Sequence, residues 1–348
     1  MAQPRVSQIR NAILEEVENH PRDVTRIIAE HFGLSRQRVS LHIKYLVTQG
    51  LLEATGKTRA RSYAVKKLVD ETFTLSVTPE LQEDLVWRER MLPLIGQVPE
   101  NILSICNYGF TEMLNNVVSH SEGTSVVISL ERRGIWVIMH VFDDGVGIFE
   151  KIQTELKLND SRHALLELAK GKLTTDQRTH TGEGIFFTSR MFDKFSILSS
   201  TLFYTRERTD EDEWLIEAEN RSRVRGTMVS MEIRLNSLHT VKEVFDRYAS
   251  GKDDYSFSRT HVPIKLAKYE HDQLISRSAA RRVLARFDEF QEVLLDFQGV
   301  DTIGQAFADE IFRVFKREHP EIEIYTINAS PEIQAMVQRA KANRLGMD

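Results

Sequence analysis

Asp143-Asp-Gly-Val-Gly147 is the stretch that decides how this 348-residue chain folds. Apolar residues precede it at every second position: Ile135, Val137, Met139 and Val141. This alternation predicts a strand with one buried face. Two carboxylates followed by two closely spaced glycines can form a hairpin turn, or a binding loop at the end of the buried strand. The motif alone leaves both interpretations open.

Three other stretches along the chain add to this motif. They are Glu112-Met-Leu-Asn-Asn116, Gly182-Glu-Gly184 and Gly226-Thr227. Glu112 and Asn116 are four residues apart in a region of helical patterning, so a helix places both on one face. Gly182 and Gly184 precede an apolar run with a helical pattern, where backbone amides can face phosphates.

In this order, with a helix before the first stretch and a strand before the second, the four motifs resemble those of a known superfamily. They match the N box, the two glycine boxes and the closing Gly-Thr strand of the gyrase, MutL and histidine-kinase ATPases, the Bergerat fold. The resemblance covers roughly residues 85–235. It implies a two-layer α/β sandwich that binds ATP and Mg²⁺ and acts as a slow Mg²⁺-dependent ATPase. Whether ATP is hydrolysed, transferred to protein or only bound stays open.

The resemblance also implies a role for each motif residue. Asn116 is the expected Mg²⁺ ligand, and Glu112 the expected catalytic base that polarises a water for attack on the γ-phosphate. Asp143 is expected to accept a hydrogen bond from the adenine amine, with the Thr227 hydroxyl supporting the same end of the nucleotide. The glycines expected to shape the binding loops are Gly145, Gly147, Gly182 and Gly184.

The stretch 150–181 between the glycine boxes is charged and free of aromatic residues. Its basic residues include Arg162, Lys170, Lys172 and Arg178. The stretch is either an ordinary solvated insertion or, as the resemblance implies, the lid that closes over ATP. Asn115 and His120, beside the first motif, are assigned to surface or core positions in preference to phosphate contact.

The N-terminal segment has the pattern of three helices followed by a basic hairpin. Apolar residues at helical spacing start at Val6, and the pattern breaks near Pro21. Gly33 ends the second predicted helix, and Ser35 is a candidate N-cap for the third. Two β-like stretches then flank a Gly-Lys-Thr-Arg-Ala-Arg tip at 56–61. This layout predicts a winged helix-turn-helix.

The charge distribution points to the same end of the chain. Residues 1–66 have 11 Lys/Arg against 6 Asp/Glu, whereas the remainder has 35 against 45, and the total is −5. A basic domain in an acidic chain is a candidate for binding nucleic acid. The predicted contacts with double-stranded DNA are Arg36, Gln37, Arg38, Ser40, Lys44, Lys57, Arg59 and Arg61. A winged helix used only for protein contact stays open as the alternative.

From about residue 256, strands and helices are predicted to alternate. Val293-Leu-Leu-Asp-Phe297, a tight loop over 299–304 and a helix start resemble the STAS-like fold of anti-sigma-factor antagonists. In the antagonists a phosphorylated Ser opens that helix, but here Gln305 and Ala306 occupy the place. We therefore expect no phosphorylation at this junction, with Thr302 and Ser278 as weaker candidates. The domain is expected to dock a regulatory protein or to form a homodimer contact.

The predicted fold class is multidomain α+β. Its parts are a winged helix (1–66), a linker (67–84), a Bergerat-type ATP-binding domain (85–236), a linker helix (237–255) and a small STAS-like α/β domain (256–348). We expect a transcriptional regulator whose output depends on the nucleotide state of the central domain. The alternatives are a Ser/Thr protein kinase resembling anti-sigma-factor kinases, and a DNA-transaction ATPase. Histidine autophosphorylation is not expected, because residues 66–100 contain no phosphoacceptor His.

The lengths of the apolar stretches and the cysteine count argue against a membrane-spanning protein and against one stabilised by disulfides or a cysteine-rich zinc site. The longest apolar stretches, such as 134–139, fall far short of the roughly 20 residues that span a bilayer, and the N-terminus lacks the apolar segment of a signal peptide. We expect a cytoplasmic protein without membrane contact. The single cysteine, Cys106, excludes an internal disulfide and a cysteine-rich zinc site.

Overall fold

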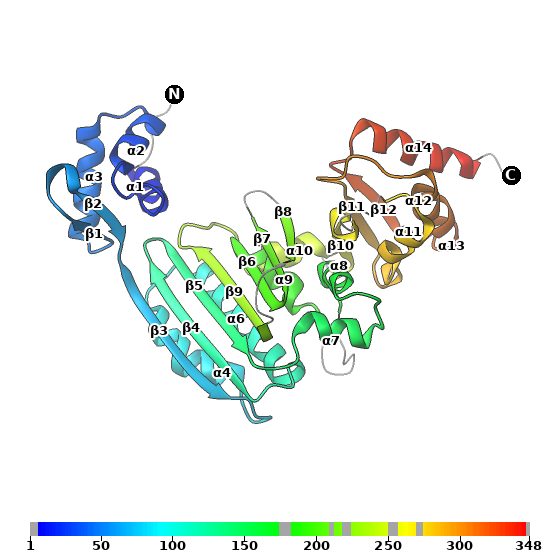
Figure 1. Ribbon diagram of the computed structural model, residues 1–348, viewed down its shortest axis with the longest axis horizontal. Coiled ribbons are helices and arrows are strands. Elements are labelled where there is room, and N and C mark those ends of the chain that lie inside the picture. Colours follow the sequence, from blue (N-terminus) through cyan, green and yellow to red (C-terminus); the bar gives the residue numbers. More distant parts are fainter. Residues whose placement is uncertain are drawn as a thin grey trace.

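Three groups of elements follow one another along the chain in the computed structural model (Figure 1). The structure describes residues 6–173, 182–208, 212–217, 224–249, 257–268 and 274–345, with the backbone alone at Arg59, 212–217 and 343–345. Below, the N-terminal domain means residues 6–65, the central domain 67–248 and the C-terminal domain 257–345. Within the described ranges, no helix has both the length and the apolar character needed to cross a membrane.

The N-terminal domain consists of three helices and a two-stranded antiparallel hairpin. These are α1 (Val6–Glu16), α2 (Val24–Phe32), α3 (Arg36–Thr48), β1 (Leu52–Thr55) and β2 (Ser62–Val65), with the short 3-10 helix η1 (Thr58–Ala60) at the hairpin tip. The predicted cap at Ser35 is confirmed, because its hydroxyl accepts a hydrogen bond from the Arg38 amide at 3.3 Å. Gly33 ends α2 at a φ of 63°, where glycine is favoured.

The central domain is a seven-stranded antiparallel sheet with helices packed on it. The sheet order is β3-β4-β5-β9-β6-β7-β8. Its strands are β3 (Lys67–Ser76), β4 (Ser125–Arg133), β5 (Trp136–Asp143), β6 (Lys194–Ser200), β7 (Leu202–Glu207), β8 (Asp212–Glu217) and β9 (Val224–Arg234). Its helices are α4 (Glu83–Val86), the π-helical turn η2 (Trp87–Met91), α5 (Leu92–Ile95), α6 (Glu100–His120), α7 (Ile148–Glu155), α8 (Arg162–Lys170), α9 (Gly184–Met191) and α10 (Val241–Tyr248).

Two segments differ from their sequence-based assignments. Residues 67–76, expected as linker, form the edge strand β3, in which Phe73 pairs with Ile128 of β4. An edge strand with one solvated side contains many polar residues, which hides its alternation. The segment 195–204, expected as one strand, is the β6–β7 hairpin, with Ser200 at its turn at a φ of 56°.

The C-terminal domain has a parallel sheet of order β10-β11-β12 covered by helices. Its elements are β10 (Arg259–Pro263), η3 (Ile264–Ala267), α11 (Arg277–Leu284), η4 (Phe287–Glu289), β11 (Glu292–Asp296), α12 (Gln305–Asp309), η5 (Glu310–Phe315), α13 (Lys316–Glu318), β12 (Glu323–Ile327) and α14 (Pro331–Leu345). Parallel neighbours require crossover connections, which α11 and the α12–α13 helix provide. The alternation predicted from sequence is therefore present.

The N-terminal domain is attached to the tip of the β4–β5 hairpin. Ile135 is 6% exposed and belongs to the apolar core formed by α1, α2 and α3, and Trp136 packs against the same core. Ion pairs surround this contact: Arg133 to Glu18 at 2.9 Å, and Arg234 to Glu15 at 3.1 Å. These four charged side chains are between 27% and 43% exposed.

The C-terminal domain is attached to α8 and α9 by a shared apolar core and by buried polar contacts. The Lys170 ammonium is fully buried and donates to Glu167 Oε1 at 2.7 Å and to the Ala285 carbonyl at 2.8 Å. In the other direction, the Thr260 hydroxyl donates to the Lys170 carbonyl at 2.7 Å. Arg286 donates to the Gly171 carbonyl at 2.8 Å.

Candidate functional site

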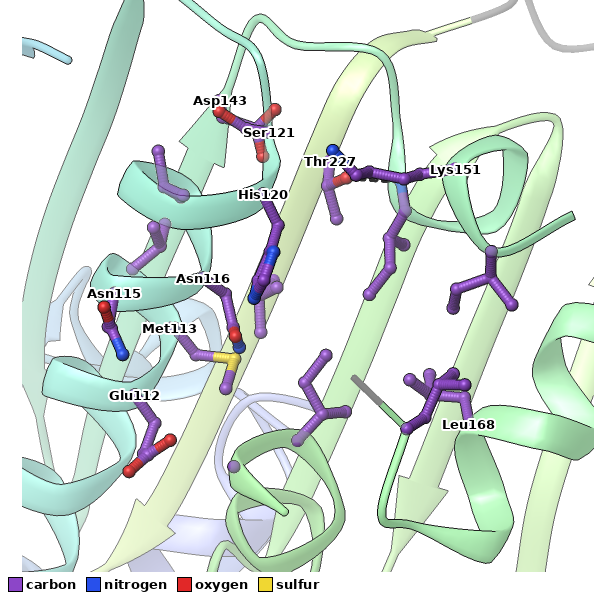
Figure 2. A pocket seen from close by; sticks show the side chains of 18 of the residues that line it. Glu112, Met113, Asn115, Asn116, His120, Ser121, Asp143, Lys151, Leu168 and Thr227 are labelled. Carbon is purple, nitrogen blue, oxygen red and sulfur yellow. Dashed lines mark hydrogen bonds between the residues drawn. The ribbon is translucent and has the colours of Figure 1, made fainter. Parts of the chain in front are cut away.

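A cavity of about 320 Å³ lies between α6, α7, α9 and the strands β5 and β9. The structure brings residues of all four sequence motifs to its walls (Figure 2). The predicted site residues that line it are Glu112, Asn116, Asp143, Gly147, Gly182, Gly184 and Thr227. Gly145 stands behind the wall, where a Cβ atom would come within 2.0 Å of the Ser121 carbonyl oxygen, so no larger residue fits.

One end of the cavity is built by paired residues of β5 and β9. Asp143 and Thr227 are direct partners in the antiparallel ladder. Asp143 Oδ1 accepts a hydrogen bond from the Gly145 amide at 2.9 Å, and the Thr227 hydroxyl accepts one from the Ile148 amide at 2.9 Å. Burial raises the pKa of Asp143 above its usual value. The loop after β5 is thereby fixed around a buried carboxyl group.

The other end of the cavity is built by α6. Glu112 and Asn116 lie one turn apart on this helix, and Glu112 lies far from Asp143 (Figure 2). Burial raises the pKa of Glu112, and the negative charge of Glu183 adds to this effect. A Cβ atom on Gly184 would be 2.1 Å from Glu112 Oε2, so glycine is required where α9 begins. The Asn116 Nδ2 atom is buried and bonds to no atom of the described residues.

Several cavity residues were not expected from the sequence. Asn115 and His120, assigned to surface or core positions, both line the cavity, as does Ser121. Lys151 of α7 also lines it, and its ammonium pairs with Glu122 at 2.8 Å. The only signal for Lys151 in the sequence is its place one helical turn after the second glycine of the 143–147 motif.

The segment between the glycine boxes borders the cavity with apolar residues, Leu168 and Leu173. Its predicted basic residues are engaged elsewhere: Arg162 pairs with Asp160, Lys170 is fully buried, and Lys172 donates to the Glu289 carbonyl. Arg178 lies outside the described residues. The expectation of an ordinary solvated insertion is wrong for α8, because the C-terminal domain covers it.

The predicted DNA contacts lie together on α3 and the hairpin tip. The side chains of Arg36, Gln37, Arg38, Ser40, Lys44, Lys57 and Arg61 are exposed, whereas Arg59 is described by its backbone alone. Two large apolar residues share the outer surface of α3, Leu41 at 68% and Tyr45 at 41% exposure. The Arg10 guanidinium stacks 3.4 Å above the Tyr45 ring.

Asp296 anchors the carboxyl ends of the strands in the C-terminal domain. Its carboxylate accepts hydrogen bonds from His261 at 2.9 Å and from Asn328 at 3.0 Å. The nearby helix α12 starts at Gln305, which offers no hydroxyl for phosphorylation. The Thr302 hydroxyl donates to Glu332 Oε1 at 3.0 Å. The start of α12 therefore offers no hydroxyl for phosphorylation, as the sequence predicts.

Comparison with known proteins identifies one part of the chain. A family model described as a STAS-like domain of unknown function matches residues 279–334, from α11 into α14. This match supports the expected STAS-like domain at the C-terminal end. No curated protein matches the chain.

Proposed function

We propose that the chain binds ATP with Mg²⁺ in the cavity of the central domain, and that nucleotide state controls how the N-terminal domain contacts DNA. In this proposal the central domain has the Bergerat fold and the N-terminal domain is a winged helix. The supporting observation is that four motifs, dispersed from Glu112 to Thr227, border one cavity. Convergent polar groups in a partly apolar pocket are typical of a ligand site.

The Asp143 end suits adenine. A buried carboxylate beside an apolar wall can accept a hydrogen bond from the exocyclic amine, while Val141 and Val229 pack against the base. The Thr227 hydroxyl already accepts from Ile148, so it remains a donor toward the cavity.

The α6 end suits the metal and the phosphates. Asn116 lines the cavity, and its amide oxygen is a hard ligand of the kind that Mg²⁺ prefers. Asn116 would hold the ion, which would neutralise charge on phosphate oxygens when bound. Glu112 is one turn away, and its raised pKa makes it a stronger base toward a water than an exposed carboxylate.

Substitution of Glu112 separates binding from turnover. Glu112→Gln keeps shape and hydrogen bonding but removes the base, so phosphate release should fall by about 10²–10⁴-fold while ATP affinity stays near that of the parent. Asp143→Asn should instead weaken ATP affinity by about tenfold, because the amide can present a donor to the adenine amine. Nucleotide titration and phosphate release on the three proteins measure both effects.

Two negative results in these assays would have different meanings. If Glu112→Gln hydrolyses ATP like the parent, Glu112 is not the base. If the parent binds no ATP, the central proposal is wrong. Labelled γ-phosphate that appears on protein instead of in solution would favour the kinase alternative.

Turnover should also depend on pH through Glu112. The base must be ionised to accept a proton, and its pKa is raised above 4.5. Activity is therefore expected to fall as the pH drops through a value above 4.5, and to be constant above that value until another group titrates. A pH–rate profile measured at saturating ATP shows this fall in activity at low pH.

DNA binding is tested by its salt dependence. Arg59→Ala with Arg61→Ala should lower the slope of log affinity against log salt by about 2, since each phosphate contact adds about 0.9. The charge-matched pair Arg88→Ala with Arg317→Ala, both exposed and outside the N-terminal domain, should leave the slope unchanged. Equal salt slopes for the two double variants would refute DNA contact by the hairpin. Failure of the parent to bind any duplex at low salt would refute it as well.

A further inference from the structure

A second cavity lies at the opposite end of α9 from the nucleotide cavity. Its volume is about 560 Å³, and α9, β7 and α10 form its walls. Helix α9 begins with Gly184 in the first cavity and has Arg190 in its last turn at the second. The charged residues that line this arginine cavity are Arg190, Arg206, Arg208, Arg247 and Glu243.

Two of the arginines build the wall. Arg190 donates to the Phe186 carbonyl at 3.1 Å and stacks over the Phe186 ring at 3.5 Å. Arg206 donates to the Ser189 carbonyl at 2.9 Å. These contacts fix the guanidinium groups that line the inner side of the arginine cavity.

The other two arginines have bonding capacity to spare. Arg208 Nη1 is buried, yet it bonds to no acceptor in the described part of the chain. Arg247 is exposed at the rim, and none of the described carboxylates forms an ion pair with it. A buried donor without a partner is unfavourable, and the positive charges around it add repulsion. An anion in the cavity would relieve the repulsion between these charges.

The nearest described carboxylates are bonded elsewhere. Glu243 caps α10 by accepting from the Thr240 amide at 2.9 Å. Asp193 accepts from the Arg234 amide at 2.7 Å and from the Ser237 hydroxyl at 2.6 Å. Both carboxylates keep their negative charge and act on Arg208, so among the described residues two carboxylates face four arginines at this cavity.

We infer that the arginine cavity binds a small phosphorylated ligand, with Arg208 and Arg247 as its principal contacts. Guanidinium groups bond phosphate oxygens through paired donors, and the side chains of Arg208 and Arg247 line the cavity without an ion pair to a described carboxylate. A volume of about 560 Å³ admits a pyrophosphate or a small organic phosphate. This site is independent of the proposed ATP site, and either can exist without the other.

Titration of inorganic pyrophosphate into the full chain tests the assignment. Arg208→Met with Arg247→Met should weaken pyrophosphate affinity by at least about tenfold, as loss of two charge-assisted contacts implies. Arg247→Met alone removes an exposed side chain, cannot disturb the core, and should weaken affinity by about threefold. The control pair Arg88→Met with Arg317→Met removes the same charge elsewhere and should bind like the parent.

Three results would overturn the inference. The parent fails to bind pyrophosphate; the control pair loses as much affinity as the Arg208 and Arg247 pair, which indicates charge without a site; or Arg247→Met and the double variant both bind like the parent, which places the pyrophosphate elsewhere. Circular dichroism of each variant establishes that it is folded.

Discussion

At its contact with the N-terminal domain, the central sheet provides apolar side chains, Ile135 and Trp136, surrounded by partly exposed ion pairs. At the contact with the C-terminal domain, helix α8 provides a fully buried ammonium, that of Lys170, bonded to a carboxylate and to backbone carbonyls beside apolar packing such as Phe186 on Phe257. The first contact is apolar with ion pairs at its edge, whereas the second contains a buried polar network within apolar packing.

The two kinds of contact are expected to respond differently to substitution of their residues. Apolar contact is non-directional, so its loss is roughly proportional to the area uncovered. A buried charge needs its whole set of partners, and losing one leaves the others unsatisfied. We therefore expect graded effects at the N-terminal contact and an abrupt effect at the C-terminal one.

The largest effect is expected from Lys170→Ala. Glu167, only 4% exposed, would lose its closest cation and keep only the longer contact with Arg286 at 3.3 Å, and breaking a buried pair costs about 3–5 kcal/mol. Urea unfolding should show this loss in the free energy of unfolding. The double variant Lys170→Met with Glu167→Leu removes both charges and should recover much of it. If the double variant is no more stable than Lys170→Ala, the pair is not the cause.

A smaller effect is expected from Ile135→Ala. The side chain is 6% exposed in the core of the N-terminal domain, and truncation of a buried isoleucine costs about 2–5 kcal/mol, with the low end expected at a domain contact that can close over the gap. Hydrogen exchange should rise in residues 6–65 and stay unchanged in the C-terminal domain. Equal increases in both would show that the two attachments are not independent.

The smallest effect is expected from the ion pairs around that contact. Arg133→Ala removes its partly exposed pairs with Glu18 and Glu131, and Arg234→Ala removes the pair with Glu15 and the stacking on Trp136. Each partly exposed pair is worth about 1 kcal/mol or less. Thermal unfolding in low and in high salt should show the difference shrink as salt screens the charges. A loss as large as that of Lys170→Ala would contradict the distinction between the two attachments.

The parts of the site that sequence predicts are those set by local geometry. Glu112 and Asn116 share a helix face because four residues make about one turn. Asp143 and Gly147 follow from a strand that ends in a tight loop, and Ser35 from its preference for helix starts. Each of these signals is contained in a few consecutive residues.

The parts that sequence missed depend on distant partners. Lysine is ordinarily solvated, and Lys170 is buried because the C-terminal domain contacts it, as at the Ala285 carbonyl. Lys151 reaches the cavity because α7 folds back over the sheet, which no local pattern encodes. The strand β3 was read as linker because half of its surface faces solvent.

The buried Lys170 also sets an order of events during synthesis. Its carbonyl partner at Ala285 lies 115 residues further along the chain. At about 5–20 residues per second, the ribosome adds that partner roughly 6–23 s after the lysine. During this interval the ammonium stays hydrated and α8 lacks its cover. The central domain therefore completes its folding only after the C-terminal domain has been translated. A translational pause between the two domains prolongs the exposure of the α8 surface to chaperones and proteases.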